Sequence, residues 1–200
     1  NVPLRQIAID QGYKLNEYGL FKKDSDEKVA GETEEGIYEK LGMRWMPPEL
    51  RENRGEIEAA QNDNLPNLIE LEDINGDLQS HSTWSDGNNT MLDMGKRAEE
   101  KGYEYLAVTD HSQSLTVAGG LTKEDIEERE EELREAEDRL DIHLLSGIEV
   151  DILKDGSLDM DAETLENLDI VLGAVHSNFK MDENEQTKRI TDAFSTGLID

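Results

Sequence analysis

Imidazole and carboxylate side chains follow the apolar runs of this sequence at regular places. Three of the four histidines and one glutamate come where a predicted strand ends: His81, His111, Glu149 and His176. Gln79 lies two residues before His81, so the two share a face of an extended segment, and Asp86 lies in the following loop. Imidazole and carboxylate without thiolate suit zinc, manganese or ferrous iron. Several such ligands together indicate a multinuclear centre in which metal ions activate water and bind a phosphate.

These residues also have simpler interpretations. A single histidine usually serves packing, whereas three at strand ends together with a glutamate indicate a shared site. The fourth, His143, begins a predicted strand, so we expect it at the opposite rim and without a ligand. Each of the other three histidines precedes a serine, but adjacent side chains on extended backbone point to opposite faces. This argues against a nucleophile–base pair.

Strands and helices alternate in the segment that must position these residues. Thr90 with Asp93, and Thr122 with Asp125, resemble capping boxes that begin two helices, and a third helix is predicted at 185–194. The predicted strands cover 73–78, 105–108, 142–150 and 170–175. This alternation is typical of a parallel α/β sheet or barrel. In such a barrel the carboxyl ends of the strands meet at one rim, where active sites form.

The first part of the chain has a different pattern. A helix ends at Gly12, and the runs 15–21 and 28–30 predict a short hairpin. A second helix follows from Thr33 to Gly42. This unit is too small to bury a large core of its own.

Pro47-Pro48 opens an acidic, Asn-rich stretch in which the second helix cannot continue. We interpret this stretch as a linker that holds one short helix at 57–61. The predicted division is a small α+β unit over 1–46, a linker over 47–72 and an α/β unit over 73–200.

Two features were considered for phosphate contact. Lys22 and Lys23 beside Phe21 are candidates for contact with a nucleic-acid backbone, although a solvated hairpin tip is the simpler interpretation. Gly119-Gly120 lacks the Lys-Ser/Thr that follows in a phosphate-binding loop.

Charge and composition exclude several classes of protein. The 200 residues carry 48 Asp and Glu against 20 Lys and Arg, a net charge of −28, which excludes a basic protein that coats duplex DNA. The absence of cysteine excludes disulfide scaffolds, thiolate zinc sites and cysteine nucleophiles. Neither an apolar run of membrane-spanning length nor a secretory signal is present, so we expect a soluble, cytoplasmic chain.

The acidic residues are concentrated after residue 48. Residues 1–48 have seven basic and nine acidic side chains, whereas residues 49–200 have 13 and 39. Two interpretations stay open: a solvated, solubilising surface, or a salt-loving source, since salt near 1 M shortens the Debye length to roughly 3 Å.

Four motifs now identify a family. Gly76-Asp77-Leu78-Gln79-Ser80-His81-Ser82-Thr83-Trp84-Ser85-Asp86-Gly87 resembles the first motif of the PHP (polymerase and histidinol phosphatase) superfamily, Gly-Asp-Leu-His-x-His-Thr-x-x-Ser-Asp-Gly. Val108-Thr109-Asp110-His111-Ser112 resembles its second motif, Gly147-Ile148-Glu149-Val150-Asp151 its third and Val175-His176-Ser177 its fourth.

The N-terminal segment resembles the thumb subdomain of bacterial and archaeal family X DNA polymerases. The resemblance is carried by Leu15-Asn16-Glu17-Tyr18-Gly19-Leu20-Phe21, Glu34-Glu35-Gly36-Ile37-Tyr38 with Leu41-Gly42, and Pro47-Pro48-Glu49-Leu50-Arg51-Glu52. In those enzymes a PHP domain follows the polymerase core. We therefore expect a fragment that runs from the late thumb into the first half of the PHP domain.

The resemblance implies a partial (β/α)₇ barrel with up to three manganese or zinc ions. It also implies 3′–5′ exonuclease activity and 3′-end processing on DNA with gaps or 3′ ends. By motif, Gln79 and His81 face the first metal, Glu149 bridges the first and second, His176 binds the second, and Asp86 and His111 bind the third. Glu149, His81 and His176 are the expected catalytic residues, and Asp110 and Asp151 orient ligands.

The sequence departs from the family pattern at Gln79, where the family usually has histidine. The family's later metal ligands are expected after Asp200 and the palm aspartates before Asn1, so we expect the chain alone to be inactive. The alternative function is a degenerate PHP module that serves as a structural or DNA-holding scaffold. A small-molecule phosphatase shares the metal motifs, but it has no reason to carry a thumb.

Overall fold

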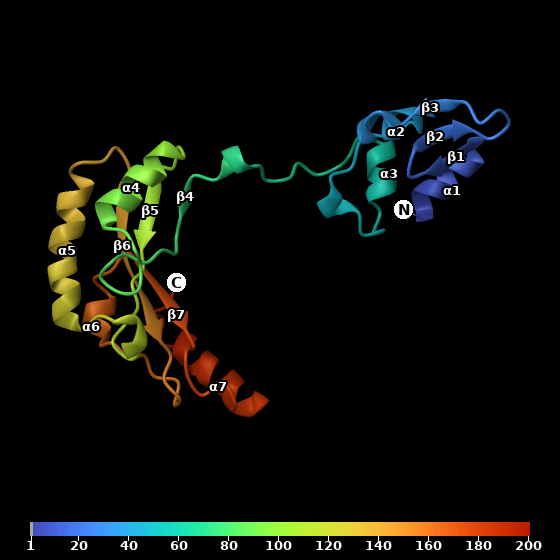
Figure 1. Ribbon diagram of the computed structural model, residues 1–200. Coiled ribbons are helices and arrows are strands. Elements are labelled where there is room, and N and C mark those ends of the chain that lie inside the picture. Colours follow the sequence, from blue (N-terminus) through green and yellow to red (C-terminus); the bar gives the residue numbers. More distant parts are fainter. Residues whose placement is uncertain (1) are drawn as a thin grey trace. The chain divides into compact units, whose positions relative to one another are not determined.

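The structure is a computed structural model that describes residues 2–200. Two compact units divide the chain between Ile69 and Glu70 (Figure 1). No helix among the described residues is long and apolar enough to cross a membrane.

The first unit is built on a three-stranded antiparallel sheet in the order β1-β2-β3. Its elements are α1 (Val2–Asp10), β1 (Tyr13–Asn16), β2 (Gly19–Lys22), β3 (Lys28–Ala30), α2 (Glu34–Lys40), the 3₁₀ turn η1 (Pro48–Leu50) and α3 (Glu56–Gln61). The run 15–21 was expected to be one arm of a hairpin, but it contains a turn. Asn16 Oδ1 accepts the Tyr18 N–H over 2.9 Å, and Gly19 follows at φ 136°. A side chain at Gly19 would place its Cβ 2.5 Å from the Ala30 carbonyl oxygen, so the turn needs glycine there.

The core of this unit includes residues beyond its sheet. Leu20 and Tyr38 pack in the same buried cluster as Ala60 and Leu65. The compact unit therefore continues through most of the predicted linker over 47–72.

The second unit is a four-stranded parallel sheet in the order β4-β5-β6-β7. Its elements are the 3₁₀ turn η2 (Leu71–Asp73), β4 (Gly76–Asp77), α4 (Met91–Glu100), β5 (Tyr105–Val108), the 3₁₀ turn η3 (Thr116–Ala118), α5 (Lys123–Glu137), β6 (His143–Asp151), α6 (Ala162–Leu165), β7 (Ile170–Ala174) and α7 (Glu183–Phe194). Strands that follow in chain order without reversal are typical of a barrel wall rather than of a doubly wound sheet. The predicted mixed α/β fold, a small α+β unit followed by a parallel sheet in barrel order, is confirmed.

Helices α4 and α5 lie side by side along the sheet (Figure 1). Thr90 Oγ1 accepts the Asp93 N–H, and Thr122 and Asp125 form a reciprocal capping box, as predicted. Four positions of α5 are buried against the sheet: Ile126, Arg129, Leu133 and Ala136. The solvent-exposed face of α5 consists mainly of glutamates.

Candidate metal centre

Extended backbone carries the site residues beyond the ends of the strands. After β4 the chain stays close to β5, because the Thr109 N–H donates to the Ser80 carbonyl oxygen over 2.7 Å. After β5, His111 forms a parallel bridge with Glu149 of β6. His176 comes two residues after β7. The parallel register therefore brings these ends to one rim.

The Glu149 carboxylate lies at the centre of the group. Its Oε1 is 3.1 Å from His176 Nε2 and 3.9 Å from His111 Nδ1. Its Oε2 is 3.3 Å from His81 Nε2. The Glu149 side chain is only 8% exposed, so its charge is held away from bulk water.

Asp86 faces two of the same imidazoles from the other side. Its Oδ1 is 3.8 Å from His81 Nδ1 and 3.7 Å from His111 Nε2. The rings of His81 and His111 stack with centroids 4.3 Å apart. The stacked pair thus lies between two carboxylates, the buried Glu149 and the half-exposed Asp86.

The donor set fits divalent cations. One group of ligand atoms within 4.8 Å of one another comes from His81, Asp86 and His111, and a second comes from His111, Glu149 and His176. The Nδ1 atoms of His81 and His111 are buried and have no hydrogen-bond partner among residues 2–200. Buried imidazole nitrogens without partners are costly, and a metal ion would satisfy them.

The protonation state of His111 also favours a cation. Burial lowers the pKa of His111 below its ordinary value, and the neighbouring His81 lowers it further. A neutral imidazole has a free lone pair for a metal ion.

Gln79 also contacts the Glu149 carboxylate, but as a hydrogen-bond donor. Its Nε2 donates a hydrogen bond to Glu149 Oε2 over 2.8 Å. An amide N–H is a donor and cannot bind a metal ion. In this arrangement the Nε2 of Gln79 supports Glu149, and its Oε1 is the atom left as a metal ligand.

Asp151 orients His176. Its Oδ1 accepts from the His176 backbone N–H over 3.3 Å and lies 3.1 Å from Nδ1 of the same ring. A carboxylate at Nδ1 leaves Nε2 to face Glu149, an arrangement that raises the basicity of a metal-binding histidine.

Asp110 fixes the loop that connects His81 to Asp86. Its Oδ1 accepts from the Ser82 N–H over 2.8 Å and from Ser85 Oγ over 2.7 Å, and its Oδ2 accepts from Ser82 Oγ over 2.8 Å. The loop closes tightly at Gly87, where an added Cβ would lie 2.1 Å from the His81 carbonyl oxygen.

Three buried charged residues behind the site were not singled out from the sequence. Asp159 accepts from Ser112 Oγ over 2.7 Å and from the Asp151 N–H over 3.0 Å. Arg189 donates to the carbonyl oxygens of Ile152 and Leu153, and over 2.8 Å to that of Ser177, next to His176. Arg129 lies under Asp110. Of these three, only the burial of Arg129 could have been inferred from the sequence, because Arg129 lies on the apolar face of its helix with Ile126 and Leu133.

The remaining candidates lie elsewhere. Lys22 and Lys23 belong to the first unit, where Lys22 Nζ pairs with Glu27 over 2.8 Å and is exposed. His143 begins β6, is 83% exposed, and has its Nδ1 3.4 Å from Glu137 Oε1.

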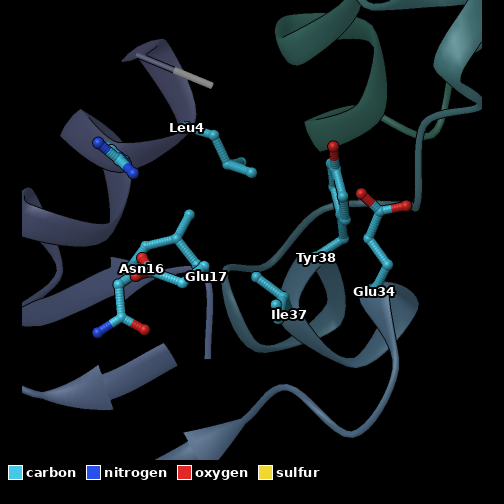
Figure 2. A pocket seen from close by; sticks show the side chains of 8 residues that line it. Leu4, Asn16, Glu17, Glu34, Ile37 and Tyr38 are labelled. Atoms are coloured by element: carbon cyan, nitrogen blue, oxygen red, sulfur yellow. The ribbon is translucent and has the colours of Figure 1, made fainter. Parts of the chain in front are cut away.

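A hollow in the first unit does not resemble this centre. It lies between α1, the end of β1 and α2, and Figure 2 shows Tyr38 beside the carboxylate of Glu34. Its lining contains Arg5 but no histidine. The metal-type ligands are gathered in the second unit.

Comparisons with known proteins agree with this division. Residues 1–52 match the family model for the DNA polymerase beta thumb, and residues 77–200 match that for the PHP domain. The chain is 39% identical over its whole length to the DNA polymerase/3′-5′ exonuclease PolX of Bacillus subtilis (strain 168). It spans 35% of the length of that relative.

Proposed function

The chain belongs to the PHP domain family and carries a DNA polymerase beta-type thumb ahead of that domain; from this we propose that its metal centre hydrolyses phosphodiesters at a 3′ end of DNA. The proposed whole protein is a family X DNA polymerase with 3′–5′ exonuclease activity in gap repair, by analogy with the Bacillus relative. Its DNA partner would have gaps or free 3′ ends, and such work would take place in the cytoplasm.

One observation carries the proposal. The buried Glu149 carboxylate has imidazole nitrogens of His81, His111 and His176 within 3.9 Å. A carboxylate shared among three imidazoles has the composition of a multinuclear site for manganese or zinc. We propose up to three such sites in the complete domain.

We propose a separate role for each residue of the centre. Glu149, His81 and His176 would bind the ions nearest the scissile phosphate, and Asp86 with His111 would bind a further ion. Bound divalent ions would supply Lewis acidity for the attack of water on phosphorus. Asp151 keeps Nε2 of His176 directed to Glu149, and Asp110 holds the loop that bears Asp86.

The charge of the substrate explains why cations are needed. A phosphodiester is an anion, and the site already contains the carboxylates of Glu149 and Asp86. Without cations the substrate would be repelled. Phosphate binding at this rim therefore requires the ions that these residues hold.

A second candidate function has one observation in its favour. Gln79 satisfies Glu149 Oε2 with an amide N–H, where a further imidazole would add a ligand. A domain that has lost a ligand could serve as a structural or DNA-holding scaffold.

The experiment that separates the two uses the full-length protein and a gapped duplex labelled at its 3′ end. The nuclease proposal expects release of 3′ nucleotides that depends on Mn²⁺ and is abolished in Glu149→Gln but not in His143→Gln. Retained DNA binding without nucleotide release in the wild type would overturn it and favour the scaffold. Hydrolysis of small phosphomonoesters alone would indicate a small-molecule phosphatase.

A further inference from the structure

Arg129 is a fully buried arginine inside the second unit. Its side chain has no exposure to solvent, and neither has that of Asp110, whose Oδ2 lies 3.8 Å from Arg129 Nη1. Burial of an unpaired guanidinium costs several kcal/mol. An arginine in this position therefore needs carboxylates around it.

Arg129 contacts its own helix α5, strand β6, and Asp110, which follows β5. Its Nη2 donates to Ser146 Oγ on β6 over 3.2 Å and to Glu130 Oε1 on its own helix over 3.1 Å. Its Nε and Nη1 have no hydrogen-bond partner among residues 2–200. Nη1 is the nitrogen nearest to Asp110, so the attraction between them is mainly that of two opposite buried charges.

Asp110 connects Arg129 to the metal centre through hydrogen bonds to the loop between His81 and Asp86. Among residues 2–200, the three hydrogen bonds of its carboxylate all go to Ser82 and Ser85, which lie between His81 and Asp86. Trp84 N–H in turn donates to Ser82 Oγ over 3.1 Å. One buried carboxylate therefore fixes much of the loop between His81 and Asp86, two of the five candidate ligands.

We propose that Arg129 is a positioning residue for the metal centre: by balancing the charge of Asp110, it holds the Ser82–Asp86 loop in the form that brings His81 and Asp86 together. The role of the loop in metal binding rests on the proposed function, whereas the order of the loop does not. Arg129 lies outside the group of candidate metal ligands, and it acts on them through Asp110.

A purely structural role for Arg129 makes a different prediction. If the arginine served only the packing of α5 against β6, its loss would loosen the sheet and the loop together. A positioning role predicts that the loop loosens first, while the amides of β5 and β6 stay protected.

The test uses hydrogen exchange of backbone amides in the full 200-residue chain, together with Mn²⁺ titration by calorimetry. Four variants are compared with the wild type: Arg129→Met, Arg129→Lys, Asp110→Asn and Arg134→Met. Arg134 is the matched control, because it lies on the same helix and is exposed.

We expect Arg129→Met to lower the protection of the amides at 82–87 at least about tenfold more than that of β5 and β6, and to weaken Mn²⁺ binding about tenfold. Asp110→Asn should loosen the same amides, Arg129→Lys should loosen them less, and Arg134→Met should change nothing. Unchanged loop protection in Arg129→Met, or an equal loss over the sheet and the loop, would overturn the proposal.

Two further outcomes are also decisive. If Arg129→Met does not fold, Arg129→Lys and Asp110→Asn decide: selective loosening of the loop in both supports the proposal, and its absence in either overturns it. If the wild-type 200-residue chain binds no Mn²⁺, the proposed role of the loop in metal binding fails for this chain, and the exchange data alone decide whether Arg129 orders the loop; the proposed function is tested separately with the full-length protein.

Discussion

The carboxamide of Gln79 and the imidazole of His81 share one oxygen of Glu149. Gln79 Nε2 lies 2.8 Å and His81 Nε2 lies 3.3 Å from Oε2. The other oxygen, Oε1, faces His176 at 3.1 Å. The two oxygens of this carboxylate therefore differ, since one is engaged by an amide donor and the other is directed only to imidazoles.

This difference predicts the effect of replacing Gln79 by histidine. Gln79→His removes the amide donor from Oε2 and adds a nitrogen ligand beside His81. We expect Mn²⁺ to bind about tenfold more tightly, which corresponds to about 1.4 kcal/mol, or with one additional ion per chain. Isothermal titration with metal analysis of the dialysed protein measures both quantities.

Gln79→Ala is the control for the loss of the amide alone. It should leave the number of bound ions unchanged, because it adds no ligand. Equal binding by the wild type and Gln79→His would show that residue 79 does not take part in metal binding.

The depressed pKa of His111 predicts a dependence of stability on pH. Burial, and secondarily His81, keep its pKa below the ordinary value of about 6.5. As the pH falls through that value, the unfolded chain takes up a proton at His111 while the folded chain does not. The free energy of unfolding of the metal-free protein should therefore fall below about pH 6.5, by at most about 1.4 kcal/mol per pH unit from this group.

Urea unfolding at several pH values between 5 and 7.5 measures this slope. His111→Asn should flatten it, whereas His143→Asn should not, because His143 is exposed at the start of β6. An equal slope in the wild type and His111→Asn would assign the pH dependence to other groups.

Arg51 predicts a local effect in the first unit. Its guanidinium donates twice to Glu34, over 2.7 and 2.8 Å, and twice to the Met46 carbonyl oxygen. It also lies over the rings of Tyr38 and Trp45. Arg51→Met should lower the free energy of unfolding of this unit by about 1–2 kcal/mol.

The fluorescence of Trp45 reports on this unit in a Trp84→Phe background, since the chain has two tryptophans. The hydrogen bond from Arg51 lowers the pKa of Glu34. The contribution of the pair is therefore present above the ordinary carboxyl pKa and is lost as the pH falls through the lowered value. Arg54→Met is the control, because Arg54 is 82% exposed and pairs with the exposed Glu52; the same loss in both variants would contradict the prediction.

The grouping of the site residues at one rim could be predicted from the sequence, because residues at the carboxyl ends of parallel strands lie at the same edge of the sheet. His111, Glu149 and His176 each follow a short apolar run, His81 follows the predicted strand 73–78, and parallel register brings the ends of these strands together. The order of the predicted strands along the chain and their apolar pattern are enough to predict this grouping. The turn within 15–21 was not predicted, although Asn16 and Gly19 are typical turn residues, because Leu15, Leu20 and Phe21 on either side of it resemble one strand.

The groups behind the rim could not be predicted in the same way. Asp159 reaches Ser112 across 47 residues, and Arg189 reaches Ile152 across 37, so no spacing rule connects them. The direction of the Gln79 amide depends on Glu149, which is 70 residues away. Arg129 was the exception, since it occupies a core position of a helix whose outer face is acidic.

The pairing of Asp151 with His176 gives the sharpest test of the site as a metal centre. Asp151→Asn keeps the size of the side chain and removes its charge, so the ring of His176 loses the partner that keeps Nε2 facing Glu149. Because carboxylates that support a metal-bound histidine typically contribute 10–100-fold to affinity, we expect Mn²⁺ binding to weaken by about that factor. His176→Ala should weaken it at least as much, and His143→Ala should leave it unchanged. Thermal unfolding without metal separates this effect from a loss of fold: a lower affinity at an unchanged midpoint supports the centre, whereas full affinity in Asp151→Asn would exclude His176 as a ligand oriented by Asp151.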